Sequence, residues 1–109
     1  MPRIARFALA ATLGALFAAA PALAETHTVE QKDKQFTVKS LKVKVGDTVA
    51  FKNADPFAHN VFSLSDTKTF DLGSYPQGQS KSVAFTTPGT VEVECAVHPG
   101  MKMKIEVAK

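Results

Sequence analysis

GTVEVECAVHPGMKMKIEV, residues 89–107, is the stretch that decides the fold. On each side of its central turn, apolar and polar residues alternate with a period of two, which is typical of strands with one buried and one exposed face. The expected inward positions are Val91, Val93 and Cys95 before the turn, and Met101, Met103, Ile105 and Val107 after it. The stretch therefore predicts two strands joined by a short loop, with Cys95 and Met101 buried at its two ends.

The same alternation runs through the rest of the chain from residue 26. Apolar residues recur at every second position in three further segments, at 41–45, 49–51 and 83–85, and in a fourth Val61 and Ser63 alternate with Phe62 and Leu64. Turn signals separate the segments: Gly46-Asp47, Asn53-Ala54-Asp55-Pro56, residues 73–78 and Thr86-Thr87-Pro88-Gly89. Short strands of this kind predict an all-β fold, a seven- to eight-stranded antiparallel Greek-key β-sandwich. A single helical turn at residues 66–70 is the one helical element expected after the N-terminal segment.

The N-terminal segment has the features of a secretory signal peptide. A short basic start with Arg3 and Arg6 precedes an apolar, Ala-rich run from Phe7 to Ala20, and Ala22-Leu23-Ala24 matches a cleavage site. The alternative is a permanent N-terminal anchor. We expect residues 1–24 to be removed, residues 25–109 to form a single domain, and the mature protein to lie in the periplasm without a membrane span.

The charge of the chain argues against a nucleic-acid partner. The formal net charge is +3, and both arginines lie in the predicted signal peptide. A near-neutral mature surface lacks the basic stripe that nucleic-acid binding needs. Five lysines cluster early in the mature chain: Lys32, Lys34, Lys39, Lys42 and Lys44. They indicate a solvated strand face, with docking of an acidic partner as the alternative.

Three residues with soft or borderline metal-binding side chains lie on the loop at the centre of the opening stretch. Cys95, His98 and Met101 are each three residues apart, and His59 offers a further imidazole upstream. Cysteine, two histidines and a weak methionine make up a blue-copper electron-transfer site, whereas zinc seldom accepts a thioether. A buried apolar cysteine, a core methionine and structural histidines are the alternatives for each residue taken alone.

The single cysteine is consistent with this interpretation. One thiol in an exported chain cannot form an internal disulfide, and metal ligation would protect it in an oxidising compartment. A Cys95–His98 nucleophile pair is the enzymatic alternative. The sequence offers no evident third residue to orient that histidine, and an inward Cys95 leaves little room for a substrate. We therefore expect a protein that is not an enzyme.

His59-Asn60-Val61, followed by Cys95-x2-His98-x2-Met101, resembles the small type 1 copper proteins, the cupredoxins, with a loop spacing most similar to amicyanins. Residues 43–49, VKVGDTV, are similar to a stretch that precedes the first histidine in that family. The resemblance implies one copper ion, with His59, Cys95 and His98 as strong ligands and Met101 as the weak axial one. It also implies that the Asn60 side chain ties the two ligand loops together. The chain departs from the family in lacking a tyrosine shortly before Cys95.

The function expected from this site is one-electron transfer between exported redox proteins. The electron donor and acceptor are unspecified, with a c-type cytochrome or a dehydrogenase among the candidates, and the carrier is expected to be monomeric. His98, at the exposed loop tip, would be the point of electron exit. A copper chaperone using the same ligands and a metal-free adhesion-type sandwich are the alternatives. Cleavage after Ala24 would also place His27 third from a free amine, an arrangement that suits Cu(II) or Ni(II), although chance placement explains it as well.

Overall fold

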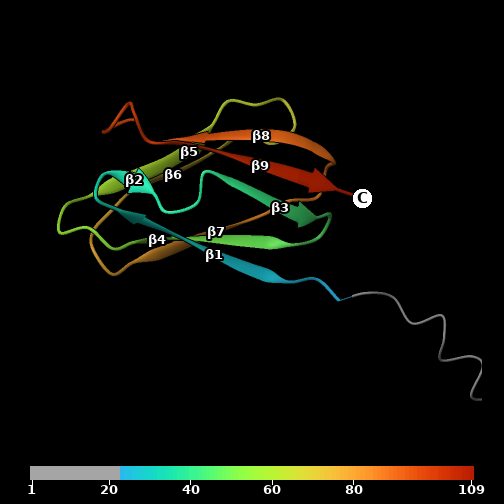
Figure 1. The fold of residues 1–109 in the computed structure, drawn as a ribbon, viewed down its shortest axis with the longest axis horizontal. Helices are drawn as coiled ribbons and strands as arrows, with labels where there is room; N and C mark the ends of the chain where they lie inside the picture. Colours follow the sequence, from blue (N-terminus) through green and yellow to red (C-terminus); the bar gives the residue numbers. More distant parts are fainter. Residues whose placement is uncertain (1–22) are drawn as a thin grey trace, which may run out of the picture.

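The computed structural model describes residues 23–109, which form nine strands in two layers (Figure 1). The strands are β1 (Thr26–Lys32), β2 (Gln35–Phe36), β3 (Ser40–Lys44), β4 (Thr48–Asn53), β5 (His59–Ser63), β6 (Phe70–Tyr75), β7 (Ser80–Ala84), β8 (Gly89–Glu94) and β9 (Lys102–Ala108). Most of the predicted signal peptide lies outside the described residues. Within residues 23–109 no helix is long and apolar enough to cross a membrane.

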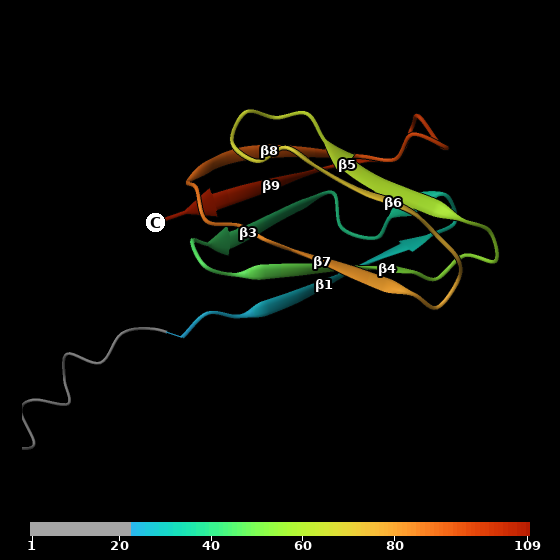
Figure 2. The same cartoon turned by 180° about the vertical axis from the view of Figure 1, so that it is seen from behind.

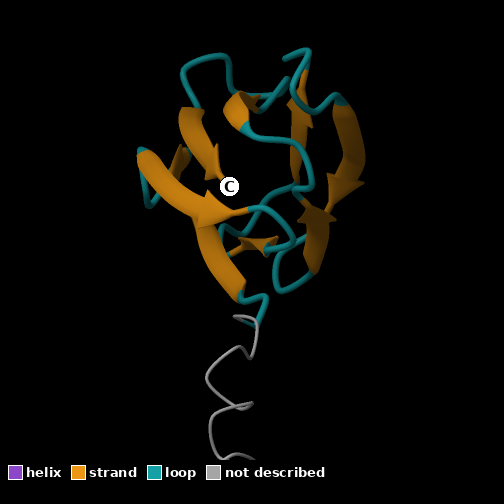
Figure 3. Cartoon of the chain, turned by 90° about the vertical axis from the view of Figure 1, so that its right-hand side faces the viewer, coloured by secondary structure: helices purple, strands orange, loops and turns teal. Residues whose placement is uncertain are grey.

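The all-β fold is confirmed, but the strand pairing is mixed rather than antiparallel. One sheet has the order β2-β1-β4-β7 and the other the order β3-β9-β8-β5-β6 (Figure 2). Figure 3, coloured by secondary structure, shows strands and loops in the described part of the chain and no helix. β1 pairs with β4 in parallel, and so does β3 with β9. The purely antiparallel prediction was wrong because alternation shows which face of a strand is buried and does not show the direction of its neighbour.

Three smaller differences concern short segments. β6 extends to Tyr75, so residues 73–75, which the sequence predicts as part of a turn, belong to a strand. The ninth strand is the two-residue β2, which is too short to show a period in the sequence. The connection between β5 and β6 contains a turn at residues 66–67, in which the amide of Lys68 donates to the carbonyl of Ser65, so the helical turn expected at 66–70 is absent.

The core lies between the two sheets and follows the predicted alternation. Every inward position expected for residues 91–107 is at most 5% exposed. Four phenylalanine rings form a row across the sandwich. Each ring contacts the next in the order Phe36, Phe51, Phe70, Phe85, with centroids 6.2–6.4 Å apart. Burying aromatic side chains of this size is a large part of the hydrophobic stabilisation of so small a domain.

Strand register brings the predicted ligand residues to one end of the sandwich. β8 and β9 form an antiparallel hairpin in which Glu94 lies opposite Lys102, so residues 95–101 form the connecting loop. β5 pairs with β8 and begins at His59, at the same end. In Figure 1 this end is on the left, and the start of β1 and the chain's C-terminus lie toward the right.

Candidate metal centre

His59 is completely buried, and its two ring nitrogens face different groups. Nε2 lies 2.7 Å from Oδ2 of Asp55, and Nδ1 lies 3.8 Å from the sulfur of Cys95. Because an ionised carboxylate can only accept, the proton belongs on Nε2, which donates it to Asp55. The lone pair of Nδ1 is therefore directed at the thiol, where a metal ion could receive it.

Asp55 is itself held in place by backbone amides. The amides of Asp33 and Lys34 donate to its two carboxylate oxygens at 2.8 and 3.0 Å. Asp33 and Lys34 adopt left-handed backbone angles, with φ of 55° and 60°, in the turn between β1 and β2. Such a turn can direct consecutive amides at one anion. Burial raises the pKa of Asp55, but the hydrogen bonds from His59, Lys34 and Asp33 outweigh it and lower the pKa overall, so the carboxylate is ionised.

The loop after β8 brings a thiol and a second imidazole to His59. Cys95 is buried and His98 is half-buried, and ligand atoms of His59, Cys95 and His98 all lie within 4.8 Å of one another. Among the described residues, Nδ1 of His98 is a buried nitrogen that has no hydrogen-bond partner. A buried polar atom left unpaired costs about 1–3 kcal/mol, so it needs an explanation. A metal ion bound by these three residues supplies one.

Met101 closes the loop from inside the protein. Its side chain is fully buried, its amide donates to the carbonyl of His98 at 2.9 Å, and its carbonyl accepts from the amide of Cys95 at 3.3 Å. These two hydrogen bonds hold residues 95–101 in a compact turn. The thioether is thus placed in the interior at the end where the other three side chains converge.

Asn60 connects the two segments that carry the candidate ligands. Its side-chain oxygen accepts a hydrogen bond from the amide of Ala96 at 2.7 Å, as the resemblance led us to expect. The backbone carbonyl of Asn60 accepts from the side-chain Nε2 of Gln31 at 3.5 Å, and the side-chain Oε1 of Gln31 accepts from the Tyr75 hydroxyl at 2.7 Å. Burial, and then the charge of a Cys95 thiolate, raise the pKa of Tyr75. This buried chain joins both sheets beneath the site.

Sequence reasoning did not identify Asp55, Gln31 or Tyr75 as parts of the site. Asp55 could have been suggested by its position, since it is the one acidic residue in the loop before His59. Gln31 and Tyr75 gave no such signal, because they come from β1 and β6 and meet only through the packing of the two sheets.

Apolar side chains surround the exposed edge of the site. The Phe57 ring is 37% exposed and lies 5.3 Å from the His59 ring and 5.4 Å from the His98 ring, measured between centroids. Val97, next to His98, is 56% exposed. The ammonium group of Lys34 lies 5.9 Å from the centre of the Phe57 ring. The site therefore reaches the surface through a small apolar patch.

Comparison with known families decides which metal this arrangement serves. The model of the family "Copper binding proteins, plastocyanin/azurin family" matches residues 24–108. The chain belongs to this copper-binding family. The cofactor of the cupredoxin site is one copper ion, which agrees with a donor set of thiol, two imidazoles and a nearby thioether.

Two relatives from Methylorubrum extorquens and one solved structure resemble this cupredoxin. The methylamine utilization protein MauL is 35% identical over 93% of this chain and 86% of its own length. Amicyanin-alpha is 32% identical over 95% of this chain and 92% of its own length. A mutant of amicyanin in the oxidized state superposes with a TM-score of 0.70 at 29% identity, covering 75% of this chain and 81% of the other. Together they confirm the cupredoxin fold and its likeness to amicyanin.

Proposed function

We propose that this cupredoxin is an exported one-electron carrier, with His59, Cys95 and His98 as strong copper ligands and Met101 as the weak axial ligand. The observation that carries the proposal is the convergence of the three strong donors at a buried His98 nitrogen for which residues 23–109 provide no hydrogen-bond partner. Copper bound there would supply a Cu(II)/Cu(I) couple.

The protein groups around the site favour small structural change during electron transfer. Asp55 fixes the ring of His59, and the amide of Ala96 ties the ligand loop to Asn60. The hydrogen bonds between Cys95, His98 and Met101 fix the spacing within the loop. Ligands fixed in this way need not rearrange when the oxidation state changes, which suits a carrier that exchanges one electron at a time.

The apolar patch around His98 suits short-lived contact with redox partners. His98 is half-buried, and Phe57 and Val97 are exposed beside it. A patch of this kind is appropriate to the small interfaces of transient electron-transfer complexes. A c-type cytochrome is one candidate partner. Since the relative MauL is described as a methylamine utilization protein, an amine-oxidising dehydrogenase is the first electron donor to test.

Export is part of the proposal and has its own test. We infer that residues 1–24 are removed and that the mature monomer acts in the periplasm. Intact mass of the protein recovered from the periplasmic fraction should correspond to a chain that begins at Glu25. Recovery of the full-length chain in the membrane fraction would instead indicate a retained anchor.

The Cys95→Ser variant tests the site directly. The oxidised copper protein should show an intense visible absorption that Cys95→Ser abolishes, because that band needs the copper–thiolate bond. Met103→Leu is the matched control, since Met103 is a buried methionine on β9 outside the ligand loop, and it should keep the colour. Colour that survives in Cys95→Ser would contradict the ligand assignment.

Voltammetry distinguishes the carrier from a copper chaperone. An electron carrier should give a reversible one-electron response and keep its copper through repeated cycles. Rapid loss of Cu(I) to an acceptor protein or chelator would favour delivery of copper over delivery of electrons.

A further inference from the structure

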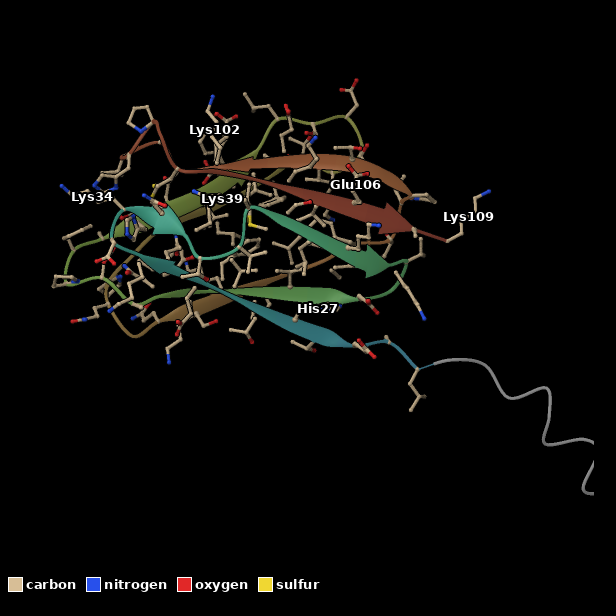
Figure 4. The ribbon with its side chains drawn as sticks, in the orientation of Figure 1. His27, Lys34, Lys39, Lys102, Glu106 and Lys109 are labelled. Carbon is tan, nitrogen blue, oxygen red and sulfur yellow. The ribbon has the colours of Figure 1, made fainter. Side chains whose placement is uncertain are left out.

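A second cluster of metal-binding side chains lies away from the copper centre. It consists of Glu25, His27 and Asp47, whose ligand atoms all lie within 4.8 Å of one another. Figure 4 shows His27 on β1, distant from Lys34 at the copper end of the molecule. Nothing in the proposed electron transfer uses these residues.

Asp47 is the fixed member of the cluster. Its side chain is 5% exposed, and its two oxygens accept hydrogen bonds from the amides of Glu25 and Lys44, both at 2.9 Å. The hydrogen bond from His27 is the main cause that lowers the pKa of Asp47 to about 2, and the two backbone amides add to it. The carboxylate is therefore ionised and held rigidly in the turn between β3 and β4.

His27 and Glu25 complete an arrangement close to tetrahedral spacing. Nε2 of His27 lies 3.0 Å from Oδ2 of Asp47 and 4.0 Å from Oε2 of Glu25. Ligand atoms on a tetrahedral zinc ion lie about 3.3–3.5 Å apart, as follows from metal–ligand distances of about 2.0–2.2 Å. The two measured separations lie on either side of that value. Glu25 is 74% exposed, so its carboxylate is free to move the short distance inward.

We propose that Glu25, His27 and Asp47 form a second metal site for a borderline divalent cation of the zinc class, with water completing the coordination. An imidazole nitrogen disfavours calcium and magnesium, which take oxygen ligands. The lack of sulfur disfavours Cu(I). Metal binding would move the imidazole proton of His27 from Nε2 to Nδ1, and two carboxylates with one neutral imidazole then balance the charge of a divalent ion. The three donors come from Glu25 just before β1, from β1 itself and from the β3–β4 turn, and the pairing of β1 with β4 already holds these segments together.

This site differs from the amine-and-amide motif that the sequence suggested for Glu25-Thr26-His27. In the structure the amide nitrogen of Glu25 donates to Asp47, and the carbonyl of Glu25 accepts from the amide of Thr48 at 2.9 Å. β1 begins at Thr26 and pairs with β4 from its first residue. The backbone is thus used by the sheet, and the proposed donors are side chains alone.

Titration with Zn²⁺ and Co²⁺ tests the proposal. The protein is first loaded with Cu(I), which is colourless and occupies the site at Cys95. Calorimetry should then show one Zn²⁺ bound per chain, and Co²⁺ should give the visible bands of a tetrahedral complex. His27→Gln should weaken binding by at least about tenfold, and Glu25→Gln should weaken it less. Glu92→Gln, which removes an exposed acid elsewhere, is the control and should leave binding unchanged.

Three results would overturn the proposal. The first is no saturable binding, and the second is binding that His27→Gln leaves intact. The third is binding that needs His27 and a free amino terminus but survives both Glu25→Gln and Asp47→Asn, because that pattern indicates the amine-and-amide motif. The same titration on a Cys95→Ser background removes a zinc-binding thiolate from the other site, so failure of this proposal can be distinguished from failure of the proposed electron transfer.

Discussion

The protein contains two histidine–aspartate pairs built in the same way. At the copper end, Nε2 of His59 lies 2.7 Å from Asp55, and at the other cluster Nε2 of His27 lies 3.0 Å from Asp47. In each pair the aspartate also accepts two backbone amide hydrogen bonds. The pair alone therefore does not make a copper site.

The two pairs differ in burial and in what the rest of the histidine meets. His59 is completely buried, and its Nδ1 faces the Cys95 thiol. The side chain of His27 is 22% exposed, and its other neighbouring metal-binding group is the exposed carboxylate of Glu25. At the copper end Asp55 anchors Nε2 of the His59 ring, whose Nδ1 faces a sulfur donor. In the proposed second site Asp47 and Nε2 of His27 would themselves be ligands, in a partly exposed setting with oxygen donors. The surrounding residues decide which metal suits each.

Asp55→Ala should have the largest effect on stability. It leaves the buried His59 ring and the amides of Asp33 and Lys34 without their acceptor. Leaving a buried donor without its acceptor costs about 1–3 kcal/mol, so the loss of all three contacts should cost about 3 kcal/mol or more. Urea denaturation of the copper-free protein measures the change, and Glu92→Ala, an exposed site, should stay within about 0.5 kcal/mol of wild type. An effect as small as that of the control would show that Asp55 does not anchor this end of the sandwich.

The contrast between the pairs also explains what the sequence could predict. Strand alternation predicted the buried positions of Cys95 and Met101, because side-chain direction in a strand is a local property. The partners of His59 and His27 were not predictable in the same way. Asp55 and Asp47 lie in turns, and their contacts depend on amides at Asp33 and Glu25 that the fold brings from more than twenty residues away. The parallel pairing of β1 with β4 was missed for the same reason.

Asp55→Asn should change the copper centre while preserving the shape of the pair. The asparagine oxygen can still accept from His59, but it carries no charge to stabilise Cu(II) and to strengthen the imidazole as a donor. Loss of such a partner typically lowers metal affinity by about 10–100-fold. We expect weaker Cu(II) binding and a higher reduction potential, measured by competition with a chelator and by voltammetry. A potential equal to that of wild type would show that Asp55 acts only as a structural support.

The acid sensitivity of the other pair depends on Asp47. Its pKa falls from 3.8 to about 2 on folding, so its ionised form stabilises the folded protein above pH 3.8. That contribution should decline as the pH falls from 3.8 to about 2, because the proton then binds the unfolded chain more tightly. Denaturation of the copper-free protein across this range should show a steeper loss for wild type than for Asp47→Asn. Parallel curves would mean that Asp47 does not gain its stabilising hydrogen bonds on folding.

His27→Gln should have the smallest effect on stability, and the matching change at His59 sharpens the comparison. His27 is partly exposed, so water can replace it as a donor to Asp47, and a net hydrogen bond of this kind is worth about 0.5–1.5 kcal/mol. His59→Gln should cost the copper-free protein more, because His59 is completely buried and the space that its ring leaves lies inside the protein. Thermal unfolding of the two variants, prepared without metal, measures the difference. An equal loss of stability in the two variants would show that burial of the histidine does not distinguish the two histidine–aspartate pairs. The metal preference of each end would then depend only on the remaining donor, Cys95 at one end and Glu25 at the other.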